Sequence, residues 1–193
     1  MEDSSLSIIV CGSIAAVAAP SYLAWLRQEV DVPLRVLLTH SAQRFVTPQV
    51  IGWHADETYT SDDPDLNPTE FARRSLGVVV LPATANTLAA AALGLAGTPA
   101  QTALLAGDRP ALFFPNMNST MWAKKSTQRN VEALRADGHV VVEPVERPVF
   151  ELWNRTNIVG LTLPTPDSAT ETIIGWLESI VAGLPDTDPA PVA

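Results

Sequence analysis

Several features that mark special classes of protein are absent or scarce in this sequence. It contains one cysteine, Cys11, which excludes an internal disulfide and favours a reducing compartment. No apolar run approaches the roughly 18 residues that a membrane-spanning helix needs. The chain begins Met-Glu-Asp-Ser-Ser, an acidic and polar start unlike the basic start of a signal peptide. We therefore expect a cytoplasmic protein that does not bind a membrane.

Basic residues are also scarce. Lysine and arginine number 12 against 21 acidic residues, for a net charge of −9, so no nucleic-acid-binding face is expected and the acidity favours solubility. The acidic run at 62–65 matches no calcium loop, and we expect no metal. With 193 residues and 47% hydrophobic content, the chain suits one domain with a sizeable core. We place this domain at 1–185 and a disordered, Pro- and Asp-rich tail at 186–193.

Short apolar runs, each leading into a helical stretch, predict the fold. The runs read as buried strands and cover residues 6–10, 33–38, 76–81, 110–114 and 139–142. Strands that are apolar throughout indicate a parallel sheet covered on both faces, so we predict a Rossmann-like, doubly wound α/β fold with three flavodoxin-like layers.

The connecting segments carry further predictions. We expect helices at residues 14–28, with Pro20 as a kink, and at 42–53. The polar, turn-rich segment 54–69 predicts a long loop, within which Asp62-Asp63-Pro64-Asp65 can sustain no regular element. A helix at 88–95 consists almost entirely of Ala and Leu, so we expect it to be buried on every side, which in a small domain means a subunit interface. Residues 143–166 show no periodicity, and a Ser168-x-x-Glu171 capping box opens the last helix.

Polar residues follow the predicted strands at their carboxyl ends, where open α/β sheets bind ligands. Gly12 and Ser13 follow the first strand and can present backbone N–H groups to a phosphate, although the three-glycine dinucleotide fingerprint is absent. Thr39 and Ser41 follow the second strand, and their hydroxyls suit a phosphate or a helix cap equally. For His40, between them, a surface or capping role is favoured over a ligand role.

The stretch 113–122 has unusual chemistry for the end of a strand. It presents Asn116 and Asn118, whose amides can hold a carboxylate without a formal charge. Met117, Met121 and a tryptophan supply an apolar, polarizable wall. The alternative is that the methionines and the tryptophan are ordinary core residues.

Three segments resemble a known family. Residues 115–122, Pro-Asn-Met-Asn-Ser-Thr-Met-Trp, resemble the Pro-x-Met-Asn-x-x-Met-Trp signature of the homo-oligomeric flavin-containing cysteine decarboxylases. Residues 82–87 are similar to that family's Pro-Ala-Ser-Ala-Asn-Thr, and 12–16 resemble its Gly-Ser-Ile-Ala-Ala opening. The resemblance implies bound FMN, with FAD as the alternative flavin, and cofactor contacts from Gly12, Ser13, Ile14, Thr39, Ser41, Phe45, Pro82, Ala83, Thr84, Asn86 and Thr87.

The resemblance also implies a reaction and its site. Asn118 would be the catalytic and carboxylate-binding residue, and the peptide substrate would contact Asn118, Met121, Trp122, Phe150 and Arg155, the last two in a substrate-clamping hairpin. Residues 63–70 resemble the epidermin-type peptidyl-cysteine decarboxylases of lanthipeptide and linaridin biosynthesis. Such an enzyme, an oxidoreductase or lyase, acts in the biosynthesis of ribosomally made and modified peptides (RiPPs). It oxidatively decarboxylates the C-terminal cysteine of the precursor peptide and gives the enethiolate from which aminovinyl-cysteine forms. The implied partners are the precursor peptide, other modification enzymes and further copies of the chain, as a homotrimer or homododecamer.

Two departures from the family pattern leave alternatives open. The family's catalytic histidine falls on Pro68, which has no side-chain base. The thiolate would then form unassisted, or Asn118 or His54 would compensate. Gly97-Thr98-Pro99 replaces the family's Asp-Asn-Leu, so one flavin contact differs. The alternative functions are a phosphopantothenoylcysteine decarboxylase-like enzyme, whose family keeps the histidine, and a flavin-binding subunit without catalysis.

Overall fold

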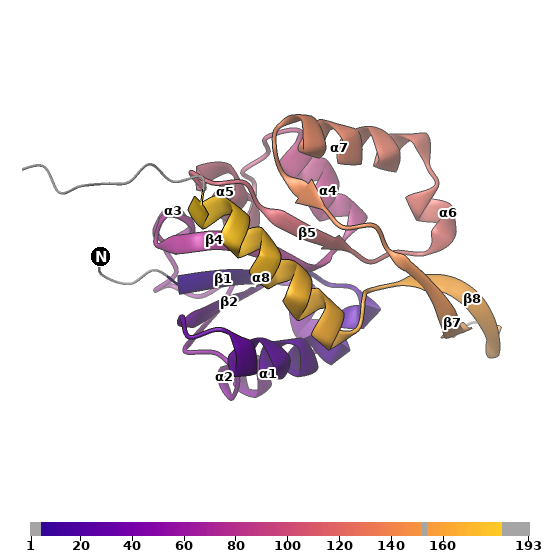
Figure 1. Cartoon of the computed structure of the whole chain (residues 1–193), viewed down its shortest axis with the longest axis horizontal. Coiled ribbons are helices and arrows are strands. Elements are labelled where there is room, and N and C mark those ends of the chain that lie inside the picture. The colour runs from indigo at the N-terminus through magenta and orange to yellow at the C-terminus, as the bar shows by residue number, and fades with distance from the viewer. Residues whose placement is uncertain (1–4, 152–153, 183–193) are drawn as a thin grey trace, which may run out of the picture.

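Six parallel strands form the centre of the computed structural model, which describes residues 5–151 and 154–182 (Figure 1). They lie in the order β3-β2-β1-β4-β5-β6, which is the doubly wound order with a switch point between β1 and β4. The predicted Rossmann-like fold is confirmed. The strands are β1 (Ser5–Val10), β2 (Leu34–Leu38), β3 (Glu57–Thr60), β4 (Ser75–Ala83), β5 (Leu112–Pro115) and β6 (Val140–Val141).

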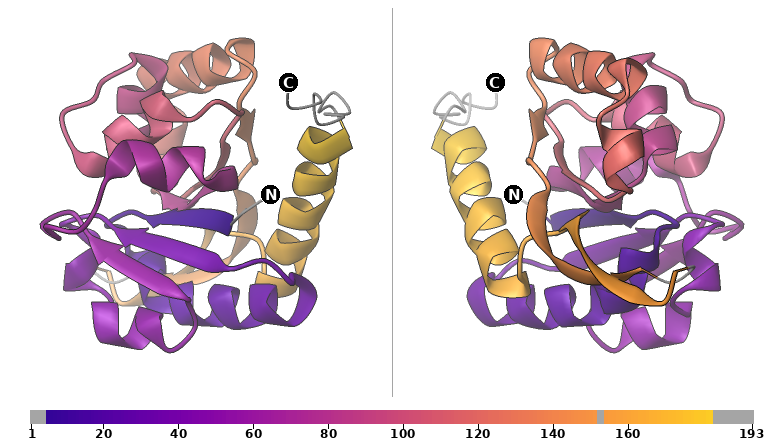
Figure 2. Two further views of the ribbon diagram at one scale, coloured as in Figure 1. Left: turned by 90° about the vertical axis from the view of Figure 1, so that its left-hand side faces the viewer. Right: turned by 90° about the vertical axis from the view of Figure 1, so that its right-hand side faces the viewer.

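Helices cover both faces of the sheet, as Figure 2 shows from two sides. A separate antiparallel hairpin, β7 (Val145–Glu151) with β8 (Thr156–Thr162), lies beyond the sheet on the side of α6 (Figure 1). The helices are η1 (Ile14–Ala18), α1 (Ala19–Glu29), η2 (Ala42–Arg44), α2 (Pro48–Gly52), α3 (Pro68–Arg73), α4 (Ala85–Ala92), α5 (Pro99–Ala106), α6 (Ser119–Trp122), α7 (Lys125–Ala136) and α8 (Pro166–Ala182).

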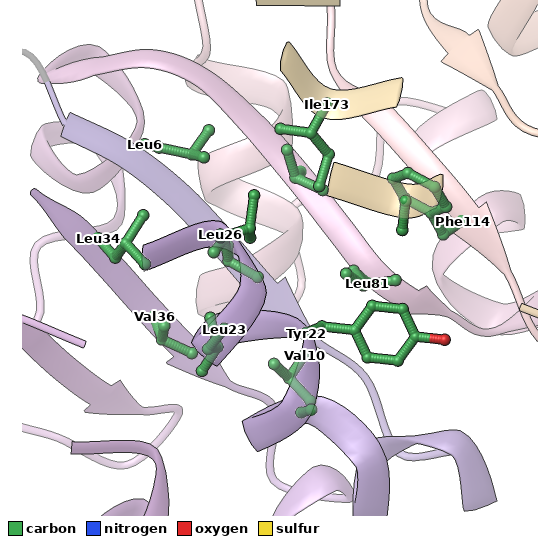
Figure 3. Packing of buried hydrophobic residues seen from close by; sticks show 14 of the residues in the cluster. Leu6, Val10, Tyr22, Leu23, Leu26, Leu34, Val36, Leu81, Phe114 and Ile173 are labelled. Carbon is green, nitrogen blue, oxygen red and sulfur yellow. The ribbon is translucent and has the colours of Figure 1, made fainter. Parts of the chain in front are cut away.

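The core has two layers because successive strand residues point to opposite faces. Leu6, Ile8 and Val10 of β1 face α1 and α8, where Leu23 and Ile173 are buried beside them (Figure 3). The alternate residues of β1 face the layer of α3, α4, α5 and α7. Every residue of β1, β2 and β5 is buried, which is why these strands read as largely apolar runs.

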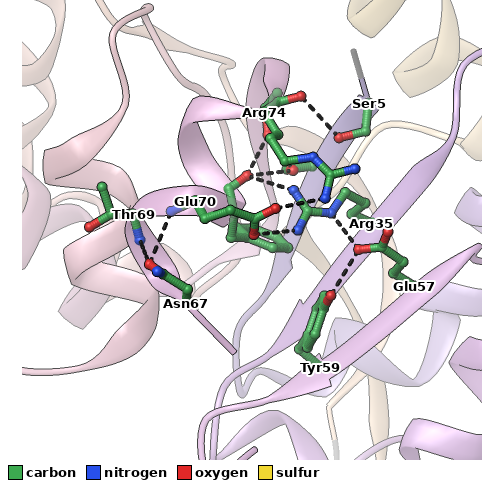
Figure 4. A network of polar contacts seen from close by, with 11 residues as sticks. Ser5, Arg35, Glu57, Tyr59, Asn67, Thr69, Glu70 and Arg74 are labelled. Carbon is green, nitrogen blue, oxygen red and sulfur yellow. Dashed lines mark hydrogen bonds and ion pairs between the residues drawn. The ribbon is translucent and has the colours of Figure 1, made fainter. Parts of the chain in front are cut away.

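The polar segment 54–69 has more regular structure than predicted. Residues 57–60 form the edge strand β3, and α3 begins at Pro68. Residues 62–65 form no helix or strand, as predicted, but the loop is shorter than the predicted 54–69 because a distant buried arginine stabilises both elements. Arg35 is 1% exposed and donates to Glu57 of β3 at 2.7 Å and to Glu70 of α3 at 2.8 Å (Figure 4).

Prolines set the boundaries of the early helices. Pro20 lies in the first turn of α1, which begins at Ala19 directly after η1, so it stands near a helix start and not inside one continuous helix as the predicted kink. The predicted helix at 42–53 is divided into η2 and α2, because Pro48 starts a new helix with Thr47 as its N-cap.

The later helices differ from the predictions at their ends. Helix α4 ends at Ala92, and Leu93 and Leu95 are 69% and 50% exposed, so the predicted burial on every side is not found within one chain. Helix α8 begins at Pro166, so the predicted capping box at 168–171 lies inside it. The predicted tail at 186–193 lies outside the described residues. No described helix is long and apolar enough to cross a membrane.

Candidate functional site

A cavity of about 710 Å3 opens at the carboxyl ends of the central strands, at the switch point between β1 and β4. Loops after β1, β2, β3, β4 and β5 form its wall, together with the first turn of α5. We call it the first cavity. Its lining residues are Cys11, Gly12, Ser13, Thr39, His40, Ser41, Ser61, Asp62, Thr84, Ala85, Asn86, Thr87, Gly97, Thr98, Pro99, Ala100, Gln101, Asn116, Met117 and Met121.

One corner of the first cavity suits an anionic oxygen group. Gly12 packs so closely on the next loop that a Cβ there would lie 2.4 Å from the Ser41 Cβ, so only glycine fits. The Ser13 hydroxyl is buried and has no hydrogen-bond partner in the part of the chain that the structure describes. A buried hydroxyl without a partner is costly. A phosphate at this corner would satisfy it.

The centre of the first cavity is a network of small polar side chains at the start of α4. Thr84 is the N-cap and accepts a hydrogen bond from the Thr87 N–H at 3.3 Å. The Thr87 hydroxyl lies 3.1 Å from the Cys11 Sγ. Burial raises the pKa of the Cys11 thiol to about 11. Cys11 is therefore a neutral wall residue at physiological pH, and the thiolate needed for nucleophilic chemistry does not form.

A second cavity, of about 630 Å3, lies between η1, the loop before α6 and the β7–β8 hairpin. Three residues, Ser13, Asn116 and Met117, line both cavities, so the two spaces adjoin through a shared wall. The remaining lining residues are Ile14, Ala15, Asn118, Ser119, Thr120, Val149, Phe150, Glu151, Ile158, Gly160, Leu161 and Thr162.

Asn118 projects from the start of α6 into the second cavity. It is the N-cap of this helix, and its Oδ1 accepts a hydrogen bond from the Met121 N–H at 2.8 Å. This bond fixes which end of the amide faces the helix. The two Nδ2 hydrogens are thereby left for a ligand, and such donors suit a carboxylate.

The predicted site residues divide into three groups. The first cavity collects Gly12, Ser13, Thr39, Ser41, Thr84, Asn86, Thr87 and Met121. The second collects Ile14, Asn118 and Phe150, with Ser13 in both. The cavity walls do not include Phe45, Pro82, Ala83, Trp122 and Arg155.

Four of these five residues pack behind the site. Phe45 and Trp122 contact the two core layers, and Ala83 is fully buried. The Pro82 carbonyl accepts a hydrogen bond from the Cys11 N–H at 3.2 Å, which joins β4 to β1 at the cavity floor. Arg155 has a positive φ of 49° in the hairpin turn. Direct ligand contacts from these residues stay predictions.

The sequence singled out Asn116 for its amide, and the structure places it in the wall that the two cavities share. Several other lining residues were not singled out. Gln101 lies two residues after the stretch 97–99, where the chain departs from the family pattern. Val149, Ile158 and Gly160 reach the second cavity through strand pairing across the hairpin. The family resemblance implied a hairpin at Phe150 and Arg155, but the aperiodic segment 143–166 did not predict which residues pair in it.

Pro68, which stands where the family has a histidine, lines neither cavity. It occupies the first turn of α3, and Asn67 caps this helix by accepting hydrogen bonds from the Thr69 and Glu70 N–H groups at 3.1 Å. Glu70 in turn pairs with the buried Arg35. Within one chain, the segment 67–70 therefore stabilises the fold.

The histidines have separate surroundings. His40 lines the first cavity at its mouth, where its Nδ1 lies 3.2 Å from an Asp62 carboxylate oxygen. His54 lies in the turn after α2, outside both cavities, and its carbonyl accepts a hydrogen bond from Arg27. The His139 Nδ1 accepts from the Ala111 N–H, and burial lowers the pKa of its ring. No cluster of metal-binding side chains is found among residues 5–151 and 154–182.

The family described as Flavoprotein matches residues 1–164. The chain belongs to the flavoprotein family. This agrees with the resemblance carried by residues 82–87 and 115–122. The mersacidin decarboxylase of Bacillus sp. is 36% identical over 172 residues, covering 88% of each chain. The bifunctional CoaBC protein of Bacillus subtilis is 31% identical over 76% of this chain, which spans only 37% of that longer protein.

Solved structures of flavoproteins share the architecture. A variant of EpiD in complex with the substrate peptide DSYTC superposes with a TM-score of 0.82 at 26% identity, covering 89% of this chain and 99% of that one. SpaF, described as an FMN-dependent cysteine decarboxylase, superposes with a TM-score of 0.75 at 34% identity, covering 91% of this chain and 97% of that one.

The first cavity fits a flavin. A flavin joins a planar ring with a polar edge to a phosphate tail, and the corner at Gly12, Ser13 and Ser41 offers donors for the phosphate. The small residues at 84–87 and 97–100 leave a broad wall for the ring. The buried, unpartnered Ser13 hydroxyl indicates that a polar group is expected there.

Proposed function

We propose that this flavoprotein is an FMN-dependent enzyme that oxidatively decarboxylates the C-terminal cysteine of a ribosomal precursor peptide. The product would be the enethiolate from which aminovinyl-cysteine forms. The observation that carries the proposal is the pair of adjoining cavities, because a flavin in the first would meet a peptide in the second across the shared wall of Ser13, Asn116 and Met117. The relatives named above support both ligands.

When bound, FMN accepts the two electrons that the cysteine loses. The protein residues hold the flavin and the peptide. Gly12, Ser13, Thr39 and Ser41 would bind the phosphate, and Thr84, Asn86 and Thr87 would lie along the ring. FMN is preferred over FAD because SpaF is described as FMN-dependent.

Asn118 would hold the substrate carboxylate through its Nδ2 hydrogens. A neutral amide positions the carboxylate without the strong stabilisation that an arginine or lysine would give it, so release of CO2 is not opposed. Ile14, Met117, Val149 and Phe150 would exclude water around the reacting cysteine. Hydrogen bonds are stronger in such a setting than in bulk water.

The structure offers no substitute for the family's histidine in the second cavity. The described residues that line it include no histidine. Cys11, which lines the first cavity, has a pKa of about 11 and is a protonated thiol at neutral pH, so it cannot accept the proton. The substrate thiol, with a pKa of roughly 8.5, is a few per cent thiolate at neutral pH. We therefore infer that the enzyme draws on this fraction.

The chain would act as a homotrimer or a dodecamer of trimers. Leu93, Leu95 and Leu105, near the ends of α4 and α5, are between 50% and 69% exposed, and exposed leucines gathered at neighbouring helix ends suit a subunit contact. The reaction would take place in the cytoplasm, on a peptide that other modification enzymes also process.

The proposal is tested with a set of short peptides that end in cysteine, among them DSYTC, and with phosphopantothenoylcysteine. Product analysis by mass spectrometry should find the loss of CO2 and two hydrogens from peptides only. Conversion of phosphopantothenoylcysteine alone would favour the coenzyme A branch. Tight flavin binding without conversion of either substrate would favour a non-catalytic subunit, the alternative that Pro68 suggests.

A further inference from the structure

We propose that Gln101 is a flavin-binding residue, whose Nε2 donates a hydrogen bond to the ring of the flavin held in the first cavity. The inference rests on the proposed function, because it requires a flavin in that cavity. Gln101 lies two residues after Gly97-Thr98-Pro99, the stretch that replaces the family's Asp-Asn-Leu, and its side chain is bonded to Gly97 of that stretch.

Hydrogen bonds fix the orientation of the Gln101 side chain. It lies in the first turn of α5 and lines the first cavity. Its Oε1 accepts from the Gly97 N–H at 2.9 Å, and its own N–H donates to the N-cap Thr98 at 3.3 Å. Rotating the amide would break the bond to Gly97 and set two N–H groups against each other. The carbonyl end is therefore held by the loop, and the NH2 end is left for another partner.

The NH2 end has no hydrogen-bond partner within the described part of the chain. The same stretch of wall offers no other polar side chain with a free donor. Its other residues are Gly97, Pro99 and Ala100, which have no polar side chain, and Thr98, whose oxygen caps α5. Gln101 is thus the oriented amide donor on this side of the first cavity.

The position of this donor matches the ring rather than the phosphate. The phosphate corner is formed by Gly12, Ser13 and Ser41, after β1 and β2. Gln101 belongs to α5, whose neighbours in space are α3 and α4. A flavin with its phosphate at that corner would extend its ring along α4 towards α5. The exposed edge of the ring carries oxygen and nitrogen acceptors, which gain negative charge on reduction, and hydrogen bonds to charged acceptors are about twice as strong as neutral ones.

Gln101 could instead serve only as a capping residue of α5, and substitution with glutamate separates the two roles. In Gln101→Glu, a carboxylate oxygen still accepts from Gly97 N–H, and Glu at this helix position is as good a capping partner as Gln. The donor is lost, and a negative charge faces the ring. Gln101→Met removes the donor without adding a charge. Gln28→Glu makes the same charge change on the exposed side of α1 and serves as control.

The test is titration of each apo-protein with FMN, together with the midpoint potential of the bound flavin. We expect Gln101→Met to weaken FMN binding about tenfold, and Gln101→Glu to weaken it further. Both should lower the potential, whereas thermal unfolding of the apo-proteins and Gln28→Glu should match the parent.

Equal FMN affinity and potential in the parent and both Gln101 variants would overturn the inference while leaving the proposed function intact. A parent protein that binds no flavin would overturn both. A fall in apo-protein stability with an unchanged flavin potential would assign Gln101 to capping alone and would also overturn the inference.

Discussion

Asn118 has two hydrogen-bonding ends, and the fold uses one of them. Its Oδ1 caps α6 through the Met121 N–H, and its Nδ2 faces the second cavity without a partner among the described residues. Aspartate is as good an N-cap as asparagine but offers no donor. One substitution can therefore separate the structural role of this residue from its proposed catalytic role.

We predict that Asn118→Asp binds FMN like the parent and loses turnover by at least about a hundredfold, because its carboxylate repels that of the substrate and donates no hydrogen bond. The measurements are peptide turnover and flavin titration. Asn67→Asp is a matched control, since Asn67 also caps a helix but lies outside both cavities. Unchanged turnover in Asn118→Asp would remove Asn118 from the mechanism.

The missing histidine leads to a prediction about pH. If the substrate supplies its own thiolate, single-turnover flavin bleaching should accelerate about tenfold per pH unit and level off near a pH of roughly 8.5. His54→Ala should leave this profile unchanged because His54 lies outside both cavities. A rate that is independent of pH from about 6 to 9 would contradict the unassisted thiolate. Loss of activity in His54→Ala would instead assign the base to His54.

At the scale of the elements, the sequence predicted the strands whose residues are buried and apolar. It missed the strand that is stabilised by side chains distant in the sequence. The apolar runs at 6–10 and 76–81 became central strands, because a strand covered on both faces needs apolar residues throughout. The edge strand β3, with the sequence Glu-Thr-Tyr-Thr, has no such pattern. It is stabilised by Arg35, which donates a hydrogen bond to Glu57 of β3 and lies 22 residues before it in the sequence. Periodicity in a single sequence does not reveal such a pairing.

The same limit applies to the site. The loops at 12–16, 82–87 and 115–122 carried recognisable motifs, and the structure brings them together because parallel strands end at one edge of the sheet. The hairpin over the second cavity carried no motif, because its strands pair mainly with each other and its outer face is exposed. Gln101 was missed because its orientation depends on a hydrogen bond to a loop.

The Arg35 network gives a prediction about stability. Partial burial alone would raise the pKa of Glu57 and of Glu70, but the hydrogen bonds and charge of Arg35 outweigh it and lower both. Carboxylates with a lowered folded-state pKa stabilise the protein above their unfolded pKa of roughly 4.3, and this contribution is lost as the pH falls through the folded-state value. The free energy of unfolding should therefore decline below about pH 4.3.

Substitutions should show whether loss of the two carboxylates or loss of Arg35 lowers the free energy of unfolding more. Glu57→Gln with Glu70→Gln leaves the buried Arg35 charge without an ionic partner, which costs about 3–5 kcal/mol. Arg35→Met should cost less, because both carboxylates are 37% exposed and keep access to water. Urea unfolding at pH 7 measures both values. A larger loss in Arg35→Met than in the double variant would contradict this account.

For the whole molecule, the exposed leucines near α4 and α5 lead to a prediction about assembly. Leu93 and Leu105 are 69% and 58% exposed. We predict that Leu93→Glu with Leu105→Glu converts a trimer or larger assembly into monomers, as measured by light scattering. Val159→Glu, which alters a residue that is 69% exposed on the hairpin, is the control and should leave the mass unchanged. A parent protein that is monomeric with flavin bound would contradict the proposed assembly.

The proposed function requires electrons to pass from a peptide in the second cavity to a flavin in the first. The most direct measurement is anaerobic mixing of the FMN-loaded protein with peptides that end in cysteine, followed by the flavin absorption band. The account predicts a single bleaching of the band and release of CO2 with a free C-terminal carboxylate, and no bleaching when the same peptide ends in an amide. A flavin that stays oxidised with every free-acid peptide, or that bleaches equally with the amides, would contradict it.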